Sequence, residues 1–113
     1  MQWYTARKLK FKAWNKEEKL LMRLNSIDCN RGELVKKNHI LLQFTGIYDK
    51  HQEEIYEMDI LLKGDKRFLV RWNPELNGWY FSPIEMPENQ QTLSTHEAVQ
   101  MLRLCSYFEG EEK

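Results

Sequence analysis

The residues of this chain that could carry out chemistry stand apart from one another. Its three histidines, His39, His51 and His96, lack the His-x-x-x-His and Cys-x-x-Cys spacings that bring metal ligands together. Its five glycines are scattered singly, so none forms a loop that could cradle a phosphate. We therefore expect a protein without catalytic activity, metal site or cofactor.

One group of acidic residues is concentrated enough to raise the question of ion binding. It consists of Glu53, Glu54, Glu57 and Asp59, with Asp65 nearby. Carboxylates that gather in space can hold a divalent cation, although such a pattern is more often the solvent face of a strand and its turn. The sequence leaves both interpretations open.

Three lysines, Lys8, Lys10 and Lys12, are the first candidates for a binding site. They alternate with apolar residues, and this period places them on one face of a strand. There they could contact a phosphate backbone, with aromatic residues elsewhere as stacking platforms. A row of lysines is also a common protection of a sheet edge against aggregation. Since the net charge of the chain is zero, we prefer edge protection and do not favour nucleic acid as the partner.

Two aromatic residues near the N-terminus, Trp3 and Tyr4, are the second candidates. Aromatic side chains dominate many protein interfaces, so these two could anchor a protein partner. The alternative is that they complete the core.

Charge is unevenly distributed along the chain. Residues 1–24 hold seven basic and two acidic side chains, whereas residues 88–113 hold two basic and five acidic ones. Such polarity could make copies of the chain attract each other head to tail, but it is equally consistent with solvated faces.

Period-2 patterning predicts strands through the first three quarters of the chain. A hairpin is expected from residues 8–14 and 19–25 around a polar turn, followed by a charged loop over 28–38. The later strands are expected at 39–44, 55–63, 66–72 and 79–81, with a tight turn at Gly64-Asp65 and a connector over 73–78.

The period changes to that of a helix after Pro87. Ser94 and Glu97 match a capping box, in which each side chain satisfies a free backbone donor of the first turn. Apolar residues then recur every three or four positions, at Ala98, Met101, Leu102, Cys105 and Phe108. We expect one amphipathic helix over about 95–108, packed on the sheet with Cys105 as a core thiol.

Length and composition indicate one globular domain over residues 1–113, β-rich over 1–84. The chain has 113 residues, of which 42% are hydrophobic and 30% charged. No segment resembles a membrane span or a secretory signal, so we expect a cytoplasmic protein, with no membrane partner. Its two cysteines, Cys29 and Cys105, are then expected to be buried, reduced thiols.

Four motifs in the first 81 residues resemble the YopX-like proteins of phages and prophages. They are Phe11-Lys12-Ala13-Trp14, Gln43-Phe44-Thr45-Gly46, Asp49-Lys50-His51-Gln52 and Ile55-Tyr56-Glu57-Met58-Asp59-Ile60. Their order and spacing agree with the family over roughly residues 7–81. The resemblance does not cover residues 85–113 and implies a phage or prophage setting without a specific activity.

Two departures from the family pattern carry structural expectations. His51-Gln52 replaces an Asn-Gly pair, which predicts a loop longer than a two-residue turn. Met58 replaces a glycine, which predicts ordinary strand geometry at that position.

Together these observations predict a mainly β protein. We expect a small twisted sheet or an SH3-like, partly open barrel of about six strands with one C-terminal amphipathic helix. The expected function is that of a non-enzymatic phage or prophage accessory protein that binds a host or phage protein, or a second copy of itself. The alternative is a small barrel that binds single-stranded nucleic acid.

Overall fold

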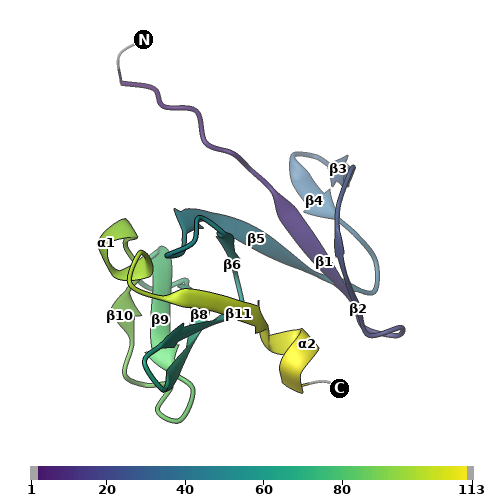
Figure 1. Cartoon of the computed structure of the whole chain (residues 1–113). Coiled ribbons are helices and arrows are strands. Elements are labelled where there is room, and N and C mark those ends of the chain that lie inside the picture. The colour runs from purple at the N-terminus through teal and green to yellow at the C-terminus, as the bar shows by residue number, and fades with distance from the viewer. Residues whose placement is uncertain (1–2, 112–113) are drawn as a thin grey trace.

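The structure, a computed structural model, describes residues 3–111 and shows a mainly β protein (Figure 1). Its strands are β1 (Phe11–Asn15), β2 (Leu20–Arg23), β3 (Asp28–Asn30), β4 (Glu33–Val35), β5 (His39–Tyr48), β6 (Glu54–Tyr56), β7 (Asp59–Lys63), β8 (Lys66–Asn73), β9 (Gly78–Pro83), β10 (Gln91–Thr92) and β11 (Leu102–Ser106). The helices α1 (Thr95–Ala98) and α2 (Tyr107–Glu111) are short. The mainly β class with a C-terminal helix is confirmed, although the described residues form more strands than the predicted six.

The first sheet has the strand order β2-β1-β5-β6. The predicted hairpin is its β1–β2 pair, in which Lys12 lies opposite Arg23. The Asn15 side chain closes the turn by accepting hydrogen bonds from the backbone N–H groups of Glu17 and Glu18. An Asn at this point therefore stabilises the turn that follows the strand.

The second sheet, β10-β9-β8-β7-β11, is antiparallel throughout and curls into a half-barrel. We use the name half-barrel for this sheet together with α1. Its apolar residues form one core cluster: Ile55, Leu61, Phe68, Val70, Phe81, Leu93, Ala98 and Met101. Ile55 joins this cluster from β6, so the two sheets share a packed boundary.

Strand β5 connects the two sheets because it is long enough to pair twice. Its first half pairs with β1, where His39 lies opposite Asn15, and its second half pairs with β6, where Tyr48 lies opposite Glu54. A register shift between Phe44 and Tyr48, where Gly46 has a positive φ of +85°, interrupts the pairing of the second half with β6.

The expected single helix over 95–108 is wrong. Ser94 does cap α1 by accepting from the Glu97 N–H, but the helix ends at Ala98. Residues 102–106 instead pair with β7, with Leu102 opposite Leu62 and Ser106 opposite Asp59. The free edge of β7 offers a ladder of backbone hydrogen bonds, and this long-range pairing outweighs the helical period of the apolar residues.

The prediction of ordinary strand geometry at Met58 is also wrong. Only Glu57 and Met58 separate β6 from β7, and this tight reversal requires a left-handed residue. Met58 has φ +68° and is held there by two backbone hydrogen bonds, Met58 N to Val70 O and Tyr107 N to Met58 O, both 2.7 Å. The family glycine at this position therefore marks a turn.

The two cysteines differ in environment. Cys29 lies in the β3–β4 hairpin and is exposed, so its expected burial is wrong. The hairpin is a two-stranded sheet of its own and packs too little against the rest to cover this thiol. Cys105 lies half-buried in β11 rather than on a helix.

Neither described helix is long and apolar enough to cross a membrane.

Candidate functional site

The three candidate lysines do not share one strand face. Lys8 and Lys10 precede β1 in an extended, exposed segment, and the Lys10 Nζ lies 2.6 Å from a carboxylate oxygen of Glu54. Lys12 lies within β1 and is only 7% exposed. Since β1 is a central strand, flanked by β2 and β5, the expectation of an edge strand guarded by all three lysines is wrong.

Lys12 is a buried cation in crowded basic surroundings. Its Nζ lies 4.3 Å from the ring centroid of Tyr56, in a cation–π contact. Burial lowers the pKa of Lys12, and the charges of Arg103 and Arg23 lower it further, although Asp59 partly opposes them. Among residues 3–111, no carboxylate forms an ion pair with this ammonium.

An open hollow of about 390 Å³ lies beside Lys12, and we call it the basic hollow. Its walls carry four basic side chains, Lys10, Lys12, Arg23 and Arg103. The remaining wall residues are Gln52, Glu53, Glu54 and Tyr56. The space is large enough for a carboxylate or phosphate group surrounded by several donors.

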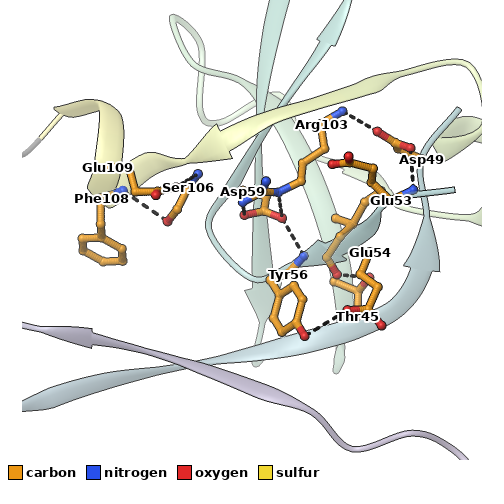
Figure 2. A network of polar contacts seen from close by, with 11 residues as sticks. Thr45, Asp49, Glu53, Glu54, Tyr56, Asp59, Arg103, Ser106, Phe108 and Glu109 are labelled. Carbon is orange, nitrogen blue, oxygen red and sulfur yellow. Dashed lines mark hydrogen bonds and ion pairs between the residues drawn. The ribbon is translucent and has the colours of Figure 1, made fainter. Parts of the chain in front are cut away.

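Arg103 is fixed at this hollow by an ion pair with Asp59, as Figure 2 shows. Asp59 is 1% exposed and accepts from the Arg103 Nε at 2.9 Å and from the Tyr56 N–H at 2.7 Å. Burial raises the pKa of Asp59, and the contacts with Arg103 and Tyr56 offset this only in part. The guanidinium therefore neutralises Asp59 and takes up a defined position beside Lys12.

The loop between β5 and β6, residues 49–53, is longer than a two-residue turn, as predicted, and we call it the junction loop. Asp49 organises it by accepting from the N–H groups of His51, Glu53 and Arg103 at 2.7, 2.9 and 2.8 Å. Figure 2 shows Asp49 between Glu53 and Arg103. Burial alone would raise the pKa of Asp49, but these three donors outweigh it and lower the pKa. The loop thereby carries Gln52 and Glu53 to the rim of the basic hollow.

Glu54 and Tyr56 form the side of the hollow next to Lys10. The Tyr56 hydroxyl donates to the Glu54 carboxylate at 3.2 Å (Figure 2). Burial and the neighbouring Glu54 raise the pKa of Tyr56 to about 12. Burial raises the pKa of Glu54, but the bond from Lys10 more than compensates and lowers it. Tyr56 thus stays a donor and Glu54 stays an acceptor near neutral pH.

The acidic residues between Glu53 and Asp59 do not gather into an ion site. Asp59 is paired with Arg103, and Glu54 is paired with Lys10. Within the described part of the chain, no three histidine, cysteine or acidic side chains come together as a set that could hold a metal.

The aromatic candidates lie away from the basic hollow. Trp3 is 85% exposed and Tyr4 is 69% exposed in the segment before β1, which Figure 1 shows extending away from both sheets. We call residues 3–10 the N-terminal arm. The alternative that these two residues complete the core is therefore wrong, while their role in binding stays a prediction.

Sequence reasoning missed Asp49 and Arg103 as parts of the site, and it considered Asp59 only as a member of the acidic group. Both aspartates lie inside motifs shared with the YopX-like pattern, and this was the available signal. Arg103 carried no such signal, because the helical period assigned its segment to the wrong element.

Comparison with known proteins gives three results. The crystal structure of protein EF1440 from Enterococcus faecalis superposes with a TM-score of 0.62 at 18% identity, covering 95% of this chain and 98% of that one. A search of curated proteins finds no match. The family described as YopX protein matches residues 1–102, well beyond the motifs over 7–81. The chain therefore belongs to the YopX family.

Proposed function

We propose that this chain is a non-enzymatic phage or prophage accessory protein of the bacterial cytoplasm that acts by binding another protein. Membership of the YopX family suggests the phage setting. The observation that carries the proposal is the N-terminal arm, where Trp3 and Tyr4 are exposed with no core to cover them. Burial of large exposed apolar side chains by a partner lowers the free energy and so favours binding.

A second protruding element supports the same function. The β3–β4 hairpin lies on the same side of the molecule as β1 and β2 (Figure 1). Its residues Leu34 and Val35 are exposed. Apolar side chains on a projecting hairpin are typical of surfaces that a partner covers. The partner is a host or phage protein, or a second copy of this chain, and the experiment below separates the two.

Single-stranded nucleic acid has weaker support as the ligand. Lys10 is paired with Glu54, and Lys12 covers a face of Tyr56, so neither stands free on a strand face. Trp72 and Trp79 pack edge to face with ring centroids 5.0 Å apart, so each ring already contacts the other and is less open to a base.

The test is capture from bacterial lysate, with and without nuclease, followed by binding of the purified captured protein. The double variant Trp3→Ala/Tyr4→Ala should lose about 2 kcal/mol or more of binding free energy, as hot-spot aromatics do. The matched control is Leu76→Ala, an exposed apolar residue in the β8–β9 connection, which should bind as the parent does.

Light scattering of the purified chain distinguishes self-association, since the same double variant should then dissociate the oligomer. Capture that nuclease abolishes would favour nucleic acid and overturn the proposal. Binding that survives the loss of both aromatic side chains would overturn the role of the arm.

A further inference from the structure

The basic hollow adjoins a second hollow whose wall is mixed and includes a group of apolar side chains. The second hollow, about 330 Å³ in volume, lies between the N-terminal arm and the segment after β2, and we call it the apolar hollow. Its apolar wall residues are Leu9, Phe11, Leu24 and Ile27. Both hollows share Lys10, Arg23, Glu54 and Tyr56, so together they form one groove with a basic end and an apolar end.

At the basic end, Arg103 is paired with Asp59 and Lys10 with Glu54, but among residues 3–111 no carboxylate forms an ion pair with Lys12. Lys12 and Arg23 are direct cross-strand partners on β1 and β2, and like charges opposite each other destabilise a sheet. Lys12 is also buried, and the Arg103 guanidinium lies at the same hollow. An anion between these three groups would reduce their mutual repulsion and compensate the burial of Lys12.

The chemistry of the walls favours a carboxylate on a peptide over a phosphate on a nucleic acid. Glu53 and Glu54 lie at the rim and would repel a run of phosphates. The ring of Tyr56 is covered by Lys12, so it does not offer that face to a base. The adjoining apolar hollow suits an aliphatic or aromatic side chain, which a peptide supplies next to its acidic one.

We propose that this groove binds an extended segment of the partner protein, with an acidic side chain in the basic hollow and a neighbouring apolar side chain in the apolar hollow. This inference rests on the proposed protein-binding function and names the chemistry of the partner. Lys12, Arg23 and Arg103 bind the carboxylate, and Leu9 and Phe11 contact the apolar side chain.

An array of capped hexapeptides tests the groove directly. One position carries Glu, Gln or Lys, and a position one or two residues away carries Leu, Phe or Ser. The full chain should bind peptides with Glu beside Leu or Phe about tenfold more tightly than those with Gln beside Leu or with Glu beside Ser.

Variants assign the preference to the groove. Lys12→Met keeps the aliphatic stem and removes the charge, so it should abolish the preference for Glu over Gln. Arg23→Gln, at an exposed position that tolerates change, should weaken the preference in the same direction and serves if Lys12→Met does not fold. Lys16→Met is the matched control, since Lys16 is exposed in the β1–β2 turn outside both hollows, and it should bind as the parent does.

Equal binding of Glu and Gln peptides would overturn the inference, as would a preference for Glu that survives both variants. Tighter binding of an oligothymidylate, competing with the peptides, would assign the basic hollow to phosphate instead. If no peptide binds while arm-dependent protein capture persists, the groove is wrong and the proposed function stands. If capture fails but the peptides bind as expected, the groove stands and the proposed role of the N-terminal arm is wrong.

Discussion

The half-barrel and the N-terminal region, residues 3–38, are built in contrasting ways. The half-barrel is the centre of the main core cluster, whose members all lie between residues 55 and 101. The N-terminal region buries Ala13 and Trp14 but exposes Leu9, Leu20 and Leu34. The first region holds the main core, whereas the second exposes apolar and basic side chains to solvent.

The contact between Trp14 and Phe108 shows how the two regions are joined. Their rings stack with centroids 5.4 Å apart, so the hairpin β1–β2 packs on helix α2. Strand β5 supplies the second connection, since it pairs with β1 and with β6. The N-terminal region is therefore anchored at its base, and its outer parts extend into solvent.

The sharpest test of this comparison is a matched pair of leucine truncations. Leu61→Ala, at a fully buried position in the half-barrel, should cost about 2–5 kcal/mol of unfolding free energy, because it leaves a cavity. Leu34→Ala, on the exposed hairpin, should change stability by no more than about 0.5 kcal/mol. Urea unfolding measures both, and equal losses would contradict the division of roles.

The second prediction concerns the junction loop and its dependence on pH. Asp49→Asn should cost about 1.5–3 kcal/mol at pH 7, because the new amide nitrogen would face a backbone donor that the carboxylate now accepts. The folded-state pKa of Asp49 is lowered, so its contribution is present above the unfolded pKa of about 4 and is lost as pH falls through the folded value.

The difference in unfolding free energy between the parent and Asp49→Asn should therefore shrink on acidification. Urea midpoints at neutral pH and at about pH 3 measure it. Glu85→Gln, an exposed acid after β9, is the control and should show little difference at either pH. A gap that is constant with pH would show that the Asp49 charge is not involved.

The third prediction compares one thiol from each region. Cys29 on the exposed hairpin should react with Ellman's reagent at least about tenfold faster than Cys105, a difference of about 1.4 kcal/mol. Burial and the neighbouring Glu109 carboxylate raise the pKa of the Cys105 thiol, so less of the reactive thiolate forms. Cys29→Ser should remove the fast phase alone, whereas two equal rates would contradict the assignment.

The smallest expected effect concerns Gln52 in the junction loop. Its φ is +66°, a left-handed conformation that costs a side-chain-bearing residue free energy and costs glycine little. Gln52→Gly should raise the unfolding free energy by about 0.5 kcal/mol, after the greater freedom of glycine in the unfolded chain is subtracted. His51→Gly, at a neighbouring residue without positive φ, should lower it, and thermal melts of both variants compare the two signs.

Sequence reasoning succeeded where local and global preferences agree. Alternation predicted the β1–β2 hairpin, and the loss of Asn-Gly at His51-Gln52 predicted a longer loop. Both features depend on residues close together in the chain, where turn chemistry and strand period act directly.

Sequence reasoning failed where contact with a segment far away in the chain determines the local structure or burial. The period of residues 98–108 is helical, yet the edge of β7 pairs with residues 102–106 and makes them a strand. Lys12 fits a solvent-facing position by alternation alone, but Tyr56 and Arg103 arrive from β6 and β11 to enclose it. The basic hollow could not be predicted, because its walls come from four strands, the junction loop and the N-terminal arm.

The late position of β11 in the chain affects how the protein is synthesised. Ribosomes extend the polypeptide from its N-terminus, so β7 has a neighbour on only one side until residues 102–106 have emerged. Until then Asp59 also lacks the guanidinium that neutralises it. A product that ends before Leu102 would have an open edge on β7 and an Asp59 without its ion-pair partner. Both defects favour aggregation or degradation of incomplete chains.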